Sequence, residues 1–117
     1  MPITPSDGVP SVPYAELYIA SEVDMGTFEG DTVKKSVDIT MINTGTDTLF
    51  VRNALPECSC TELFIRDSIL LPGDSGIITA TLDVNGYPSD SVRREFGILS
   101  NDRRERVKRV ALIGVRK

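Results

Sequence analysis

The sequence contains no histidine and no tryptophan, and it has only two cysteines in 117 residues. Without histidine, the chain offers no Ser-His-Asp triad, no Cys-His pair and no histidine ligand for zinc or copper. Phosphate-binding loops of the Walker type and Gly-x-Gly-x-x-Gly turns are also missing. Because no nucleophile–base pair can be named, we expect a protein that is not an enzyme and that binds no cofactor.

Long apolar runs are missing too. No run approaches the roughly 18 residues of a membrane span, and no basic start followed by an apolar segment marks a signal peptide. The net charge of −4 argues against a nucleic-acid partner. Charge is uneven, since residues 91–117 hold nine basic and three acidic residues, whereas the rest hold four and fourteen. We interpret this as strands of opposite charge pairing across a sheet, with a basic face for an acidic partner as the alternative.

Proline is concentrated at the start of the chain. Residues 1–13 contain four of the seven prolines. Proline fixes φ and donates no hydrogen bond, so these residues are expected to form an extended leader or tether. The sequence therefore predicts one folded domain at residues 14–117.

From residue 14 onward, short runs alternate apolar and polar residues with the period of two that is typical of a half-buried strand. Such runs occur at residues 15–23, 33–41, 48–55, 62–66, 77–84, 91–100 and 106–115. The clearest two place these side chains on one face: Val33, Val37, Ile39 and Met41, and then Ile78, Ala80, Leu82 and Val84. Segments rich in Gly, Asn, Asp and Pro separate the runs. The pattern predicts an all-β, Ig-like antiparallel β-sandwich of about seven strands, with residues 62–66 as an edge strand.

Six short motifs occur in an order that resembles a bacterial family called domain of unknown function 1573. The motifs are VDMGTFEGD, MINTGTDTL, CSCTEL, LLPGDSG, LSND and ALIGV. More distantly, the chain is similar to the Hydin and major-sperm-protein branch of Ig-like sandwiches. Met25 stands where the family usually has an aromatic residue, and Ser59 replaces a glycine. The positions that match are Asp24, Gly26, Glu29, Gly30, Asn43, Thr44, Gly45, Cys58, Cys60, Thr61, Pro72, Gly73, Gly76, Asn101 and Gly114.

The resemblance implies an Ig-like sandwich without an established activity. It also implies an extracytoplasmic setting in bacteria, periplasmic or extracellular, commonly with a lipid anchor attached upstream of the domain. Most of the matching positions have structural explanations: we expect tight turns at Gly30, Gly45 and Gly73, and we expect the Asn43 side chain to cap its own turn. The implied role is a non-catalytic envelope module that binds an unknown protein or glycan, or that acts as a spacer.

Cys58 and Cys60 are the one place in the sequence where reactive chemistry is plausible. In an extended strand their Cα atoms would lie about 6.5 to 7 Å apart, near the upper limit for a disulfide. We therefore favour reduced, largely buried thiols, because free cysteine is among the most buried residue types. A local disulfide, thiol redox chemistry, and Cu(I) or Zn(II) binding with help from Met25 and Met41 are the alternatives.

Overall fold

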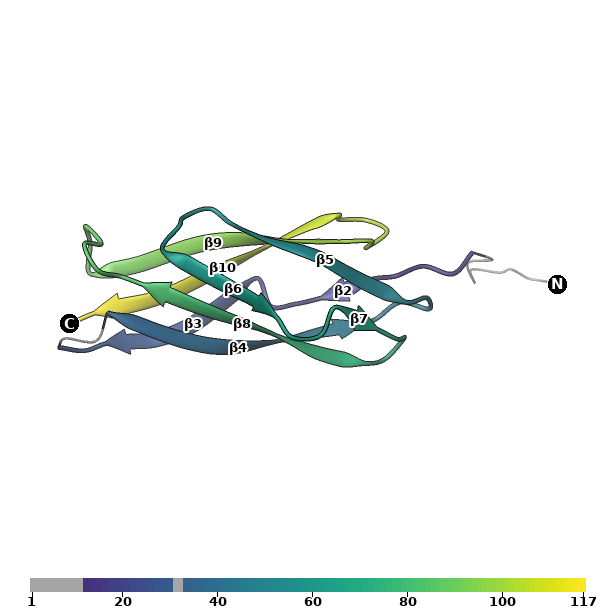
Figure 1. The fold of residues 1–117 in the computed structure, drawn as a ribbon, viewed down its shortest axis with the longest axis horizontal. Helices are drawn as coiled ribbons and strands as arrows, with labels where there is room; N and C mark the ends of the chain where they lie inside the picture. The colour runs from purple at the N-terminus through teal and green to yellow at the C-terminus, as the bar shows by residue number, and fades with distance from the viewer. Residues whose placement is uncertain (1–11, 31–32) are drawn as a thin grey trace.

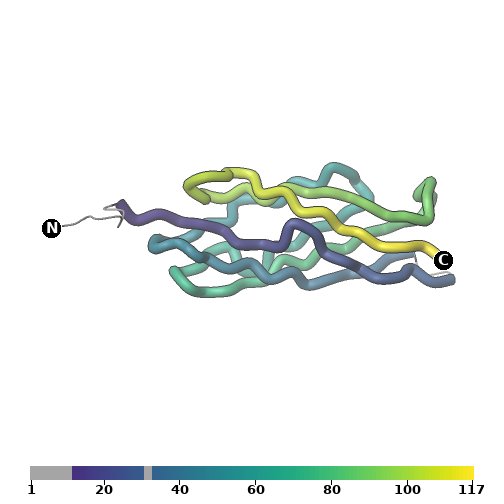
Figure 2. Tube along the Cα trace, turned by 180° about the vertical axis from the view of Figure 1, so that it is seen from behind, coloured from purple at the N-terminus to yellow at the C-terminus, as the bar shows by residue number. Residues whose placement is uncertain are grey.

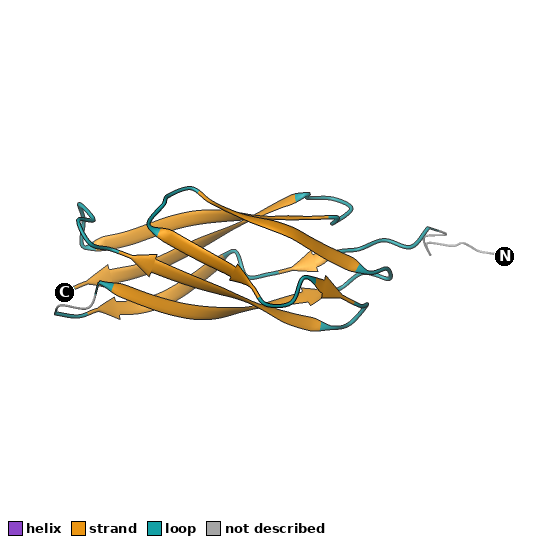
Figure 3. Ribbon diagram, viewed as in Figure 1, coloured by secondary structure: helices purple, strands orange, loops and turns teal. Residues whose placement is uncertain are grey.

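The protein folds as two β-sheets packed face to face (Figures 1 and 3). The computed structural model describes residues 12–30 and 33–117, and within them it contains strands and turns but no helix. The five-stranded sheet has the spatial order β3 (Glu22–Phe28), β10 (Val107–Arg116), β9 (Ser91–Ser100), β5 (Leu49–Pro56) and β7 (Ile69–Leu70). The four-stranded sheet has the order β2 (Leu17–Tyr18), β4 (Lys34–Asn43), β8 (Ser75–Asp83) and β6 (Thr61–Ile65). The prediction of an all-β sandwich is confirmed, with nine strands in the described residues rather than about seven.

The core lies between the two sheets and is built from the apolar faces that the period of two predicts. In β8 and the residue after it, alternate side chains are at most 1% exposed: Ile78, Ala80, Leu82 and Val84. β4 buries Ile39 and Met41 in the same way, whereas Val33, just before the strand, is 38% exposed. The other sheet contributes the largest buried side chains, among them Phe28, Leu49, Phe96, Ile98, Val110 and Leu112.

The N-terminal run differs from its prediction, because residues 15–23 do not form one strand. Leu17 pairs with Asn43 in the four-stranded sheet, and the chain then passes to the other sheet and begins β3 at Glu22. β3 runs parallel to β10, so the sandwich is not purely antiparallel. Figure 2 shows this N-terminal strand in purple beside the yellow C-terminal strand. The alternation reports which side chains are buried but not the sheet to which a strand belongs.

Most of the predicted tether lies outside the described residues, which begin at Val12. From Tyr14 onward the chain is bonded to the sandwich. The backbone N–H groups of Thr46 and Asp47 donate to the Tyr14 carbonyl at 2.7 and 2.8 Å. Ala15 forms a parallel bridge with Asp102. No helix in the described part of the chain is long and apolar enough to cross a membrane.

Candidate functional site

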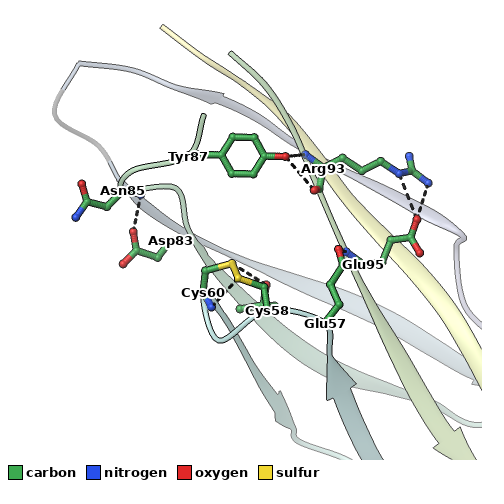
Figure 4. Close-up of a disulfide and its surroundings, with 9 residues drawn as sticks. Glu57, Cys58, Cys60, Asp83, Asn85, Tyr87, Arg93 and Glu95 are labelled. Atoms are coloured by element: carbon green, nitrogen blue, oxygen red, sulfur yellow. Dashed lines mark hydrogen bonds and ion pairs between the residues drawn. A yellow bond between two sulfur atoms is a disulfide. The ribbon is translucent and has the colours of Figure 1, made fainter. Parts of the chain in front are cut away.

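The two cysteines lie where the chain crosses from one sheet to the other, between the end of β5 and the start of β6 (Figure 4). Glu57 extends the ladder of the first sheet, because its N–H donates to the Glu95 carbonyl at 3.2 Å and its carboxylate accepts from the Glu95 N–H at 2.8 Å. Further along, the Cys60 carbonyl accepts from the Asp83 N–H at 2.9 Å and begins the ladder of the second sheet. The cysteine segment is therefore the link between the two sheets.

A disulfide joins Cys58 to Cys60. The chain turns at Ser59, so the two Cα atoms are 5.1 Å apart rather than at strand spacing. The Thr61 N–H donates to the Cys58 carbonyl at 3.1 Å and closes this turn. The favoured expectation of reduced, largely buried thiols is therefore wrong: the described cysteines are bridged, and both are partly exposed. The physical reason is that a turn, not a strand, carries the pair.

One backbone contact polarises the disulfide. The Cys60 N–H donates to Cys58 Sγ at 3.1 Å, whereas Cys60 Sγ lies 3.9 Å from the hydroxyl of the buried Thr61. A hydrogen bond to sulfur stabilises the thiolate form, so the geometry favours Cys58 as the sulfur that would leave if the bridge were opened.

A shallow depression lies beside Cys60 on the four-stranded sheet. Its volume is about 70 Å³, well below the roughly 300 Å³ of the smallest ordinary ligand pockets. It is lined by Lys34, Ser59, Cys60, Glu62, Thr81 and Asp83. The depression is therefore too small for a drug-sized ligand, but one of the two bridged cysteines, Cys60, lines it.

We expect reduction of the disulfide to lower the free energy of unfolding by only about 1.6 kcal/mol, because the bridge closes a loop of about three residues. Urea titrations with and without a reducing agent measure the difference, and the double variant Cys58→Ser/Cys60→Ser gives the value without thiols. A loss above about 4 kcal/mol would contradict this expectation, because it would exceed what so short a loop contributes.

The geometry gives little support to the alternative of Cu(I) or Zn(II) binding, which needs thiolates and further ligands. The thiolate is the form of cysteine that binds metal, and a disulfide contains no thiolate. Met25 and Met41 are buried in the core, and no cluster of three or more His, Cys, Asp or Glu side chains that could hold a metal ion is found in the described part of the chain. A nearby basic side chain could stabilise a thiolate. The basic residues nearest to the cysteines in sequence contact other groups, however: Arg52 lies over the Phe50 ring and Arg66 pairs with Asp38.

Asn43 is the most connected of the predicted motif residues. Its side-chain oxygen accepts from the Gly45 N–H at 2.9 Å, which agrees with the expected cap, and from the Glu16 N–H at 3.5 Å. Its amide donates to the carbonyls of Asp47 and Leu70 at 2.8 and 2.9 Å. The side chain is fully buried, so Asn43 ties its turn to other segments of the fold rather than to its own turn alone.

Gly45 is required for a different reason from the one expected. It does not have a positive φ. A Cβ at this position would clash with the Tyr14 carbonyl oxygen and would lie 2.8 Å from the Glu16 backbone nitrogen. The glycine therefore lets the N-terminal segment pass close to the turn.

The remaining motif positions are spread over the fold rather than gathered in one place. Gly26, Gly30 and Gly73 have positive φ values of 79°, 56° and 86°, which favours glycine. Gly76 and Gly114 are positions of close contact, with Asp67 and Leu70 for the first and with the Gly26 carbonyl for the second. The others are Asp24, whose side chain accepts from the Gly26 N–H; Pro72, in the turn before β8; Thr61, beside the disulfide; and Asn101, which bonds the backbone of Phe50 and Thr48.

Asp102 is a buried charged residue that sequence reasoning missed. The residue is 2% exposed, and its carboxylate accepts from the backbone N–H groups of Leu17, Arg104 and Glu105 at 2.7, 2.7 and 2.8 Å. Burial alone raises the pKa of this carboxyl, but the three hydrogen bonds and the nearby Lys108 hold it below its usual value. The one signal for this residue in the sequence is an aspartate at the start of a turn. Nothing in the sequence indicates its hydrogen bond to Leu17, which lies 85 residues away.

Charged side chains pair across the outer face of the five-stranded sheet. Arg93 contacts Glu22 at 3.1 Å and Glu95 at 3.2 Å, and Arg109 contacts Glu95 at 2.9 Å. The Arg109 and Arg93 guanidinium groups hold the pKa of the Glu95 carboxyl below its usual value. Of these three pairs, only Arg93–Glu22 joins the basic segment 91–117 to the acidic rest of the chain, whereas the two pairs of Glu95 lie within residues 91–117.

Comparisons with known proteins place this geometry in context. The family model described as "Protein of unknown function (DUF1573)" matches residues 18–115. A protein of unknown function from Porphyromonas gingivalis W83 has a TM-score of 0.77 at 15% identity; the match covers 95% of this chain and 51% of that one, so this chain spans about half its length. The ASH/PapD-like domain 7 of human CEP192 has a TM-score of 0.62 at 10% identity, covering 100% and 98%. The periplasmic chaperone SfaE has a TM-score of 0.56 at 9% identity, covering 86% and 58%.

No curated protein matches the sequence. At these identities the similar structures show a shared fold and no more. The family match covers most of the folded chain, and it includes the cysteine motif and the turns around Asn43 and Gly73. The resemblance seen in the sequence is thus confirmed, and the chain belongs to the DUF1573 family of proteins of unknown function.

Proposed function

We propose that this chain is a non-catalytic module of the bacterial cell envelope that binds a protein partner through the outer face of its five-stranded sheet. The observation that carries the proposal is an exposed apolar area on that face. Leu55 and Val107 are 43% and 40% exposed, and both lie against Gly97. Exposed aliphatic side chains at the centre of a surface, with charged groups around them, are typical of protein interfaces.

The absence of a side chain at Gly97 lets its apolar neighbours approach this position. Leu55 lies directly opposite Gly97 in the pairing of β5 with β9. From the other side, a methyl group of Val107 fills the space over Gly97, at 2.7 Å from where a Cβ would be. Leu99, the cross-strand neighbour of Val107, extends the area, and Arg109 lies opposite Gly97 at its rim.

A second exposed apolar pair lies nearby on β5 and β7. Phe50 and Ile69 are cross-strand neighbours, and they are 40% and 61% exposed. The aliphatic side chains of Leu55, Val107 and Ile69 favour a protein over a glycan as the partner, because they offer a sugar neither hydrogen bonds nor an aromatic ring to stack on.

The envelope setting rests on two further points. Disulfides form and persist mainly in oxidising compartments, and the described cysteines are bridged. SfaE, which has a similar fold, is a periplasmic chaperone. The arrangement also suits a spacer, because the first described residues and the C-terminus lie at opposite ends of the sandwich (Figure 1).

Affinity capture from a bacterial envelope fraction tests the binding role. We expect the wild-type domain to retain a specific protein and the variant Leu55→Lys/Val107→Lys to lose it, because two charges would replace the apolar centre. Leu55 and Val107 are both at least 40% exposed, so the midpoint of thermal unfolding of this variant should be unchanged. The matched control is Tyr18→Lys/Val33→Lys, which adds the same charges at side chains that are 56% and 38% exposed and lie in or directly beside strands of the other sheet. Equal capture by wild type and Leu55→Lys/Val107→Lys would reject this face, and no capture at all would favour the spacer role.

The disulfide supports a second candidate function, thiol–disulfide exchange with a dithiol substrate. A substrate thiolate would attack Cys60 Sγ from the depression, and Cys58 would leave as a thiolate that the Cys60 N–H stabilises. A second substrate thiolate would then displace Cys60. The substrate is oxidised to a disulfide, and the Cys58–Cys60 pair takes up the two electrons and becomes a dithiol.

Mixing the oxidised domain with a reduced dithiol peptide tests this candidate. We expect one peptide disulfide for each domain, measured by mass after acid quenching, and none with Cys58→Ser/Cys60→Ser. A wild-type domain that leaves the peptide reduced, while an added small disulfide oxidises it, would exclude exchange.

A further inference from the structure

The sandwich has four sheet edges, and they differ in how much backbone they leave open. β2 and β7 are edge strands of only two residues each. β3 is longer, but the Lys35 ammonium donates to the carbonyls of Met25 and Thr27 at 2.6 and 3.1 Å. A lysine in this position blocks the addition of another strand. The five-residue strand β6 is the remaining edge, and within the described ranges no side chain bonds to its outward backbone groups.

The backbone of β6 alternates between the two directions of the sheet. The Cys60 carbonyl accepts from the Asp83 N–H and the Arg66 N–H donates to the Ile77 carbonyl, both at 2.9 Å, so even-numbered residues bond to β8. The odd-numbered residues Leu63 and Ile65 therefore point their N–H and C=O groups away from the sheet. An added strand would find four backbone groups here.

The side chains on the outer face of β6 have a symmetric order. Phe64 is 65% exposed and stands in the middle, with Glu62 two residues before it and Arg66 two residues after it. If a second β6 pairs antiparallel with Phe64 opposite Phe64, then Glu62 falls opposite Arg66 on both sides. In the same register Leu63 falls opposite Ile65, which aligns the four free backbone groups of each strand.

We propose that two copies of this chain associate through their β6 edges, with Phe64 on the two-fold axis. Glu62 then faces Arg66 of the second copy, Arg66 faces its Glu62, and the two four-stranded sheets join into one continuous sheet. Closed two-fold symmetry of this kind is the commonest form of self-association. Central aromatic pairs and flanking opposite charges are the cross-strand contacts that stabilise antiparallel strands.

The charge pattern is what selects a second copy as the occupant. Shifting the register by two residues in either direction places a charged residue opposite Phe64 and separates both charge pairs. The contact of Arg66 with Asp38 within one chain is 3.7 Å long between side chains that are 53% and 56% exposed, so it holds Arg66 only weakly. The interface is small, so the dimer is expected to be weak and to depend on protein concentration.

Charge exchange at the two positions tests the pairing by sedimentation velocity of the full chain. Glu62→Arg and Arg66→Glu should each raise the dimer dissociation constant by about tenfold, because two attractive pairs become repulsive. An equimolar mixture of the two variants should recover wild-type association, since the mixed dimer again has two opposite-charge pairs. Glu29→Arg and Arg104→Glu, which carry the same charge changes elsewhere, should leave association unchanged.

A cysteine in place of Phe64 tests the register independently. Directly opposite residues of a non-hydrogen-bonded pair have Cα atoms about 4.5 Å apart, which suits a disulfide. Phe64→Cys should therefore form a covalent dimer, with mass spectra showing the two introduced sulfurs joined to each other. Glu62→Cys, whose two copies would lie about four residues apart, should not cross-link. The proposal is overturned if the wild type is monomeric up to ~1 mM, if the mixture of charge variants fails to associate, or if both cysteine variants cross-link equally.

Discussion

Replacing Asp102 with alanine is expected to lower the free energy of unfolding by about 3 kcal/mol, among the largest effects we predict for a polar side chain. The carboxylate accepts from three backbone N–H groups, and one of them belongs to the buried Leu17 in β2. The alanine variant leaves that donor without a partner and releases the loop after β9. Urea unfolding measures the loss, and a loss below about 1 kcal/mol would show that water replaces the carboxylate.

The same residue makes stability depend on pH in a defined direction. The pKa of Asp102 is lowered in the folded protein from its ordinary 3.8, so folding favours the ionised form. Its contribution is fully present above the unfolded pKa and is lost as pH falls from about 3.8 through the folded pKa. Asp102→Asn keeps one acceptor oxygen but has no carboxyl to titrate. The difference in stability between wild type and Asp102→Asn should thus be constant near neutral pH and shrink below about pH 4.

Replacing Asn43 with alanine is expected to cost about 2 to 4 kcal/mol. The substitution removes four hydrogen bonds of a fully buried side chain and leaves the Leu70 carbonyl without its amide donor. Asn101→Ala is the matched control, because Asn101 also bonds two backbone groups but is half-buried, and it should cost about 1 kcal/mol. Thermal or urea unfolding of both variants measures the ranking. Equal losses would mean that burial does not set the cost.

Particular elements show how far the sequence could predict the fold. The alternation in residues 77–84 identifies both β8 and its buried face, because a strand packed on one side needs that period. Residues 15–23 have the same alternation but divide between two sheets, since alternation carries no information about partners. The resemblance to the family could be recognised from the sequence because residues such as Gly73 and Asn43 are favoured by the local conformation of their turns.

The candidate site was less predictable. The spacing of Cys58 and Cys60 was interpreted with strand geometry, and the turn at Ser59 that brings the sulfurs together depends on two sheets ending beside it. The role of Asp102 depends on a contact with Leu17, which no local pattern shows. Residues 62–66 were expected to form an edge strand. The symmetric charges of β6 indicate a partner strand only once the structure shows which residues direct their backbone N–H and C=O groups away from the sheet.

The state of the two cysteines in living cells tests most directly whether this chain works as an oxidised envelope module. The full-length protein can be alkylated in intact bacteria with a cell-permeant reagent, then reduced, labelled with a second reagent and analysed by mass spectrometry. The structure predicts that Cys58 and Cys60 carry only the second label, because they form a disulfide and disulfides persist in oxidising compartments. First label on both cysteines would contradict the account, since it would show free thiols in the native setting.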